Sequence, residues 1–278
     1  MIFDTHAHYD DEAFDGDRDQ VLMGLKEAGV GTVLNVGASM ESSERTLALT
    51  EQYPFVYGSA GVHPSETAEL DEEKFRRLCE ILKNPKMLAV GEIGLDYYWE
   101  EPEHEIQKKW FLRQLELARQ MKLPVIIHSR DAAKDTLDMM KEARAGEIGG
   151  VIHCFSYGTE IAREYLNLGF FLGIGGVLTF KNAKKLKEVA ACAPIEQIVL
   201  ETDCPYMAPT PHRGTRNTSA NLPYVVNALA EIKGLTPEQV IEITEKNARR
   251  LYRMDVRAGA GQTGRQERTQ GKNTDIVD

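Results

Sequence analysis

The chain of 278 residues has few cysteines and no long apolar run. Its four cysteines, Cys79, Cys154, Cys192 and Cys204, include no C-x-x-C pair, which argues against a disulfide framework or a cysteine-based zinc site. No apolar stretch approaches the roughly 20 residues that span a bilayer, and no basic segment followed by an apolar one opens the chain. We therefore expect a protein of the reducing cytoplasm, without a membrane anchor.

The chain also has fewer basic than acidic residues. Lysine and arginine together number 33, against 43 aspartates and glutamates, which gives a formal net charge of −10. Proteins that hold nucleic acid by broad electrostatic attraction are usually basic. An anionic substrate would therefore have to be bound locally, by a few cationic side chains or by bound metal ions.

Short apolar runs rich in valine, isoleucine and glycine alternate with longer segments of helical period. The runs lie at 1–4, 32–37, 56–63, 88–94, 125–129, 150–155, 170–176 and 198–203. Helices are predicted over 72–82 and 107–121, and Thr236 with Gln239 predicts a capping box at the start of a last helix. Eight strands that each precede a helix favour a single (β/α)8 TIM barrel, an α/β fold, over an open doubly wound sheet.

We assign the barrel to residues 1–254. Residues 255–278 have almost no apolar side chains until the last few positions, which predicts a disordered C-terminal tail. The barrel segment shows no exposed apolar stripe that would require a partner, so we expect a monomer.

Side chains that bind metals recur where the predicted strands end, which is the end at which active sites of this fold lie. Since residues two apart share a face of a strand, Glu92 is expected above Val90 and Leu88, His128 above Ile126, and Glu201 on the face of Asp203. A single polar residue at a strand end would be explained by capping, but six of the eight runs carry one. These are His6 and His8, His63, Glu92, His128, His153, and Glu201 with Asp203. The pattern predicts a shared metal site at the C-terminal ends of the strands.

The candidate ligands exceed the three or so that a catalytic zinc-type site takes from the protein. Six ligands suit two divalent cations if one carboxylate bridges them, and Glu92 is in a natural position to bridge. Two such cations can share a hydroxide and stabilise the attacking and leaving oxygens of a displacement. Mixed nitrogen and oxygen ligands suit Zn, Mn, Co or Ni, and Mg is the alternative that an oxygen-rich shell would favour. The six are His6, His8, Glu92, His128, His153 and Asp203.

Several longer motifs, in order from residue 1 to about 254, resemble those of the TatD-family metal-dependent hydrolases, a branch of the amidohydrolase-like barrels. They are DTHAHYD, GVHP, GEIGLDYY, PVIIHSRDA, VIHCFS, LETDCPY and RGTRN. The resemblance implies that His6, His8, Glu92 and Asp203 hold one cation, and that Glu92, His128 and His153 hold the second. It also implies an exonuclease-type deoxyribonuclease. In the last motif Thr215 stands where the family often has lysine.

A proton acceptor is also expected. Asp203 is the first candidate to take a proton from the attacking water, and Glu92 shares the catalytic centre with it. Glu201 is a second acceptor, a ligand for a further cation, or a hydrogen-bond partner of a histidine. Asp4, on the face of His6, is a candidate to orient the ring of His6 or His8.

Phosphate binding requires positive charge, and guanidinium groups match phosphate oxygens. Arg130 and Arg213 are predicted to bind the substrate, and His63 is assigned to the substrate side rather than to the fold alone. Arg216 and His212, in the same loop as Arg213, are further candidates for substrate binding. Lys181, Lys184, Lys185 and Lys187 either add attraction or form a solvated helix face.

Aromatic residues follow Glu92 directly. Tyr97, Tyr98 and Trp99 would either stack a nucleobase or pack over the barrel mouth. His104, in an acidic helix start, is predicted to be a surface residue.

Two other functions fit the same ligands. The first is hydrolysis of a small amide, lactone or phosphoester, since fold does not fix function. Several barrels with that chemistry bridge their metals with a modified lysine, but the strand runs contain no lysine and Glu92 takes that place. The second is a non-catalytic, metal-stabilised binding protein, against which the complete ligand set argues.

Overall fold

A computed structural model describes residues 1–254, and the tail predicted for 255–278 lies outside these described residues. Eight parallel strands follow one another around a single sheet in the order β1 to β8. The strands are β1 (Ile2–Ala7), β2 (Val30–Val36), β3 (Val56–Ala60), β4 (Met87–Asp96), β5 (Val125–Arg130), β6 (Gly150–Ile152), β7 (Phe171–Ile174) and β8 (Ile198–Leu200).

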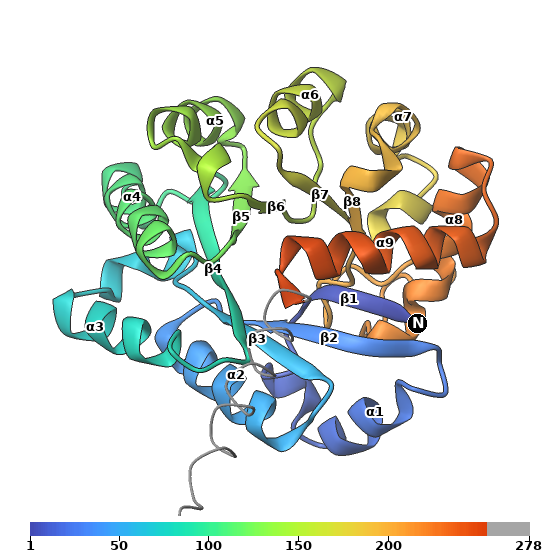
Figure 1. Ribbon diagram of the computed structural model, residues 1–278, viewed down its shortest axis with the longest axis horizontal. Coiled ribbons are helices and arrows are strands. Elements are labelled where there is room, and N and C mark those ends of the chain that lie inside the picture. The colour runs from blue at the N-terminus through green and yellow to red at the C-terminus, as the bar shows by residue number, and fades with distance from the viewer. Residues whose placement is uncertain (255–278) are drawn as a thin grey trace, which may run out of the picture.

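Helices surround this sheet (Figure 1). They are α1 (Arg18–Gly24), α2 (Met40–Gln52), α3 (Glu72–Ile81), α4 (His104–Met121), α5 (Ala133–Glu142), α6 (Thr159–Asn167), α7 (Lys184–Cys192), α8 (Leu222–Lys233) and α9 (Pro237–Leu251). Helices α3 and α4 confirm the predictions for 72–82 and 107–121, and α9 begins with the predicted capping box of Thr236 and Gln239.

The sheet closes through residues that follow β8. Ala7 of β1 pairs with Cys204, the N–H of His8 donates to the carbonyl of Cys204 at 2.8 Å, and the N–H of Asp203 donates to the carbonyl of His6 at 2.9 Å. The fold is therefore the predicted (β/α)8 barrel. The closing hydrogen bonds also place Asp203 beside the two histidines of β1.

An apolar cluster fills the barrel interior, and α9 contributes to it. Figure 1 shows α9 running inward from α8 to lie beside β1. Tyr252, directly after α9, is fully buried and its hydroxyl donates to the carbonyl of Thr5 at 3.0 Å. The cluster consists of Phe3, Leu34, Val36, Leu88, Ala89, Ile126, Val151, Phe171, Val199, Ala248, Leu251 and Tyr252.

The alternation predicted for β4 is wrong at Val90. Leu88 and Ile126 belong to the inner cluster as predicted, whereas Val90 packs with the outer cluster between strands and helices. The pairing of β4 with β5 shifts register between Val90 and Ile93, so a strict alternation does not run through this segment.

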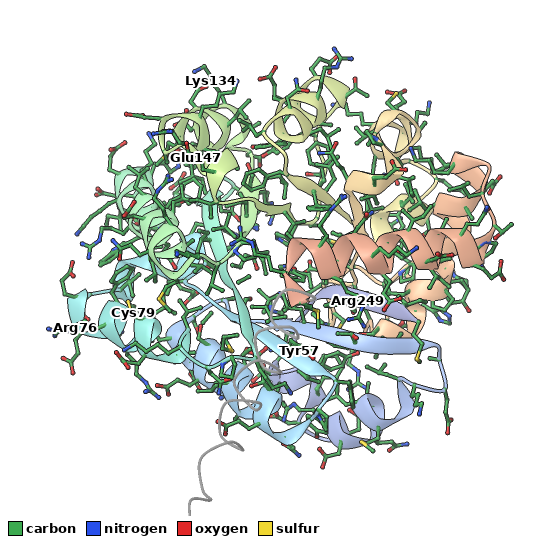
Figure 2. The ribbon with its side chains drawn as sticks, viewed as in Figure 1. Tyr57, Arg76, Cys79, Lys134, Glu147 and Arg249 are labelled. Atoms are coloured by element: carbon green, nitrogen blue, oxygen red, sulfur yellow. The ribbon has the colours of Figure 1, made fainter. Side chains whose placement is uncertain are left out.

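The outer faces of the helices carry charged side chains. Figure 2 shows Arg76 of α3 and Lys134 of α5 projecting away from the strands, and both are exposed. No helix within residues 1–254 is long and apolar enough to cross a membrane.

Candidate metal centre

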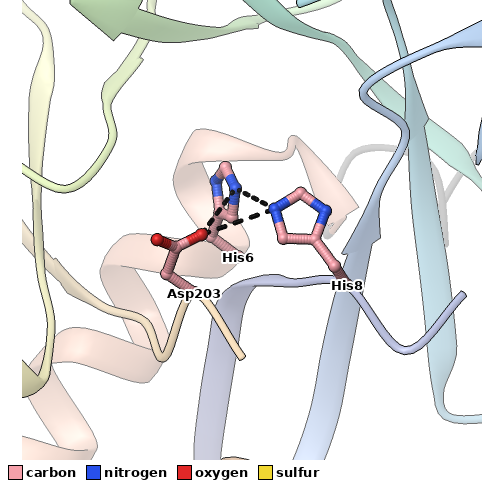
Figure 3. Close-up of side chains that lie close together, drawn as sticks. All are labelled: His6, His8 and Asp203. Carbon is pink, nitrogen blue, oxygen red and sulfur yellow. Dashed lines mark hydrogen bonds and ion pairs between the residues drawn. The ribbon is translucent and has the colours of Figure 1, made fainter. Parts of the chain in front are cut away.

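Two histidines and an aspartate meet where the first and last strands close the barrel (Figure 3). The Nε2 atoms of His6 and His8 lie 3.1 Å apart, and Oδ1 of Asp203 lies 3.7 Å from the first and 3.4 Å from the second. Nδ1 of His8 lies 2.9 Å from the carbonyl oxygen of Val36. Because a carbonyl only accepts, Nδ1 of His8 carries a proton, and its Nε2 is directed at the cluster.

Glu92 lies between two pairs of histidines. Its Oε1 is 2.8 Å from Nδ1 of His128 and 2.7 Å from Nε2 of His153. Its Oε2 is 3.4 Å from Nε2 of His6 and 3.9 Å from Nε2 of His8. Each oxygen of one buried carboxylate thus faces a different histidine pair. Burial alone would raise the pKa of Glu92, but the surrounding imidazoles, with His153 first, hold it well below its ordinary value.

A second carboxylate orients His128 from its other side. Nε2 of His128 lies 2.9 Å from Oδ2 of Asp96, which leaves Nδ1 directed at Glu92. Asp96 is itself fixed, since Oδ1 accepts from the N–H of Tyr98 at 2.9 Å and its backbone bonds to the amide of Gln107. Histidines that bind metals commonly donate their second nitrogen in this way. Asp96 is not among the site residues predicted from the sequence, although it stands four residues after Glu92 on the same strand.

The histidines of the centre differ in charge, since burial lowers the pKa of His6 to about 4 whereas carboxylates stabilise the charged forms of His8 and His128. Burial lowers the pKa of His8 and of His128, but the nearby carboxylates outweigh it and raise both to about 9. Asp203 acts on His8, and Asp96 with Glu92 acts on His128. Within residues 1–254, no lysine or arginine forms an ion pair with Glu92, Asp96 or Asp203, whose ion-pair partners are all histidines. The donor set of nitrogen and carboxylate oxygen therefore suits divalent cations.

Glu201 lies behind His6 and His153. Its Oε1 accepts from the N–H of Cys154 at 2.5 Å, and its Oε2 is buried without a hydrogen-bond partner. Nδ1 of His6 and Nδ1 of His153 are also buried and unpartnered, and these three residues could together hold a cation. A Cβ on Gly173 of β7 would lie 2.2 Å from Oε2 of Glu201, so a larger residue there would displace this carboxylate. Burial raises the pKa of Glu201 to about 8.

The segment after β8 departs from the expected alternation. Because β8 ends at Leu200, Glu201 and Asp203 do not share a strand face, and Asp203 has a left-handed φ of 56°. Asp203 faces His6 and His8, whereas Glu201 bonds to the segment after β6.

Asp4 does not bond to the ring of His6 or His8, contrary to expectation. Its carboxylate accepts from the hydroxyl of Thr202 at 2.6 Å, from the N–H of Thr202 at 3.0 Å and from the hydroxyl of Ser219 at 2.6 Å. Asp4 therefore ties β1 to the segment that carries Asp203.

A cavity of about 640 Å³ opens above these groups. His63, Arg130, Trp99 and Tyr206 line it together with His8, Glu92, His128, His153 and Asp203. Nε2 of His63 lies 3.7 Å from Oε1 of Glu92, and its Nδ1 bonds to the hydroxyl of Ser65 at 2.8 Å. His63 and Arg130, both predicted to contact the substrate, thus line this cavity.

The loop after β8 places its arginines and His212 outside this cavity lining. The guanidinium of Arg213 lies 4.3 Å from the ring centre of Phe180, and Nε2 of His212 lies 3.1 Å from the hydroxyl of Tyr224. Arg216 donates to both carboxylate oxygens of Asp17, at 2.8 and 2.6 Å. That bidentate pair holds Arg216 against the segment before α1 rather than offering it to a substrate.

The three aromatic residues after Glu92 have different environments. Tyr97 stacks on His104 with ring centres 3.7 Å apart and donates its hydroxyl to Asp135 at 2.9 Å, so it belongs to the fold. His104 is exposed, as predicted, but it packs on this ring. Tyr98 and Trp99 are exposed at the mouth.

Several known proteins are similar to this chain over most of its length. The profile of a family described as TatD related DNase matches residues 3–253. The metal-dependent hydrolase YabD of Bacillus subtilis, named as uncharacterized, is 40% identical over 255 residues, which cover 92% of this chain and 100% of YabD. A protein of Rahnella sp. named 3'-5' ssDNA/RNA exonuclease TatD is 31% identical over 92% of this chain and 100% of its own length. The crystal structure of YjjV, a TatD homologue from Escherichia coli, superposes with a TM-score of 0.85 at 32% identity, covering 90% of this chain and 97% of YjjV.

Proposed function

The chain belongs to the TatD-related DNase family, and from that premise we propose that it is a two-metal hydrolase that cleaves DNA phosphodiester bonds. The observation that carries the proposal is Glu92, whose two oxygens face two different histidine pairs. The name of the Rahnella relative supports a nucleic acid substrate. A small amide or lactone substrate has no comparable support among the relatives described above.

In this proposal His6, His8, Asp203 and Glu92 would hold one cation, and Glu92, His128 and His153 would hold the other. Such cations, when bound, lower the pKa of water and stabilise charge on phosphate oxygens. Zn, Mn, Mg, Co and Ni are the candidates, and the mixed donor set favours the transition metals over Mg.

The protein's own residues prepare the attack. Burial raises the pKa of Asp203, but the bond with His8 and the charges of His6 and His153 outweigh it and hold the pKa below its ordinary value. Asp203 is therefore ionised and can accept the proton of the attacking water. Arg130 binds a nonbridging phosphate oxygen, because it lines the cavity and its guanidinium packs on Tyr98 without an ion pair to any residue in 1–254. His63 contacts the substrate on the Glu92 side of the cavity.

A substrate panel tests the proposal. Purified protein is assayed against single-stranded DNA, duplex DNA, RNA, simple phosphodiesters and N-acyl amino acids, with chelator and with added Mg, Mn or Zn. We expect metal-dependent hydrolysis of DNA that disappears in Asp203→Asn. Turnover of an amide without any phosphodiesterase activity would replace the proposal with the amidohydrolase alternative, and binding without turnover would support the non-catalytic one.

A further inference from the structure

Exposed aromatic side chains gather at one end of the barrel. All nine phenylalanines, two tryptophans and ten tyrosines lie within residues 1–254, and only four of them are exposed there: Tyr98, Trp99, Tyr206 and Tyr224. All four follow β4 or β8 on the carboxyl-terminal side. Large apolar side chains left in water on one side of a domain mark a binding surface more often than scattered ones do. Trp99 and Tyr206 line the cavity that contains the metal-ligand candidates.

Trp99 is held at the cavity edge by a small stacked group. Its indole contacts the ring of Tyr98 edge to face, with centres 4.8 Å apart and planes at 90°. The guanidinium carbon of Arg130 lies 3.7 Å from the centre of the same Tyr98 ring. Trp99 is 55% exposed. Tyr98 thus supports both Trp99 and Arg130, while most of the indole surface is left open.

The charges of the cavity limit what phosphate contacts can contribute. Arg130 is the only lysine or arginine among its described lining residues, whereas Asp10, Asp11, Glu66 and Asp96 add carboxylates to those of Glu92 and Asp203. A polyanion would be attracted by Arg130 and by bound cations, and repelled elsewhere. Stacking on an aromatic ring avoids this repulsion because it acts on the uncharged base.

We propose that Trp99, supported by Tyr98, stacks an unpaired nucleobase adjacent to the phosphate that Arg130 binds. The inference rests on the proposed phosphodiesterase function and specifies how that site holds its substrate. Both faces of a base inside a duplex are covered by its neighbours, so only a single-stranded or extruded base can stack on the indole. Trp99 is thereby a substrate-binding residue that selects unpaired bases.

The two tryptophans make stacking directly observable. Trp110 is 3% exposed in α4, so a ligand in the cavity can quench only Trp99. Full-length protein is titrated with a short oligothymidylate in chelator, which prevents cleavage, and tryptophan fluorescence is recorded. We expect quenching in wild type and in Trp110→Phe, and none in Trp99→Phe. An abasic oligomer of equal length and charge should produce no quenching. Equal quenching by the abasic oligomer, or quenching that survives in Trp99→Phe, would overturn the proposal.

Kinetics separate this inference from the proposed function. With metal present, Trp99→Ala should raise KM for the oligothymidylate about 5- to 150-fold with kcat nearly unchanged, and Trp99→Phe should recover most of the loss. Tyr224→Ala removes an exposed aromatic side chain outside this cavity and serves as the matched control. Normal hydrolysis with an unchanged KM in Trp99→Ala would refute stacking and leave the phosphodiesterase intact. Quenching of Trp99 in a wild-type protein that hydrolyses no phosphodiester would refute the proposed function and leave stacking intact.

Discussion

The two ends of the barrel carry different kinds of buried side chains, apolar at one end and ionisable at the other. At the amino-terminal end, Phe3, Phe171 and Tyr252 pack tightly, and the single buried hydroxyl of Tyr252 has its acceptor in Thr5. At the carboxyl-terminal end, imidazoles and carboxylates crowd together, and several of their buried atoms have no hydrogen-bond partner. A protein leaves buried polar groups unpaired at a cost in stability. The contrast indicates that one end serves folding and the other serves binding.

The same contrast predicts which changes affect stability and which affect chemistry. In this fold the amino-terminal end supports the structure and the carboxyl-terminal end carries the activity. Substitutions at the α9 end should therefore alter the free energy of unfolding, and changes at the cavity end should alter metal binding, kcat or KM.

Removing the metal ions should have the largest effect and should separate the two ends most clearly. We expect chelation to abolish hydrolysis, and re-addition of cation to restore it. The thermal midpoint should fall, because cations that bind only the native state stabilise it by about 2.7 kcal/mol per site at a hundredfold excess over Kd. Unfolding should remain a single cooperative transition in calorimetry. Loss of that transition would show that the metals hold the barrel together. The carboxyl-terminal end would then serve folding as well as binding.

Tyr252→Ala should lower stability and leave catalysis unchanged. Truncating a fully buried aromatic side chain should lower the free energy of unfolding by about 3–5 kcal/mol, measured by urea denaturation. The kcat of the folded fraction should be unchanged. Tyr252→Phe keeps the packing and removes one hydrogen bond, so it should cost about 1 kcal/mol. A comparable loss in both variants would mean that packing at this end is not what stabilises the barrel.

Within the cavity end, the two predicted phosphate-binding arginines should differ. Arg130→Ala should raise KM for DNA about 10- to 100-fold, because a charge-assisted hydrogen bond is lost, with bound metal unchanged. Arg213→Ala should change KM only a few-fold, since Arg213 packs over Phe180 outside the cavity lining. Initial rates with metal analysis check both variants. A larger increase in KM in Arg213→Ala than in Arg130→Ala would mean that the substrate lies along the loop after β8.

Much of the fold and of the centre was predictable because strand ends converge. Histidines and acids on separate strands can be recognised in a sequence as soon as the strands are assigned to one barrel. His6, His8, His128 and His153 meet around Glu92 as this geometry requires. The register shift in β4 was not predictable from period-two alternation, which assumes regular pairing.

The remaining contacts depend on positions that alternation does not determine. Asp96 was missed because its role depends on the ring of His128, a residue of the next strand. Asp4 bonds to Thr202 and Ser219, which are nearly 200 and more than 200 residues away, so a local pattern could not reveal its partners. The bidentate pair of Arg216 with Asp17 is equally distant in sequence.

The central claim is that one carboxylate, Glu92, joins two cation sites, and metal content measures it directly. Purified wild type and Glu92→Gln are loaded with excess Zn, freed of unbound ion and analysed for metal per chain, with circular dichroism confirming the fold. Gln keeps the size of the side chain and removes its charge. The account predicts about two cations per chain in wild type and loss from both sites in Glu92→Gln. Two tightly bound cations in the variant, or a single one in wild type, would contradict it.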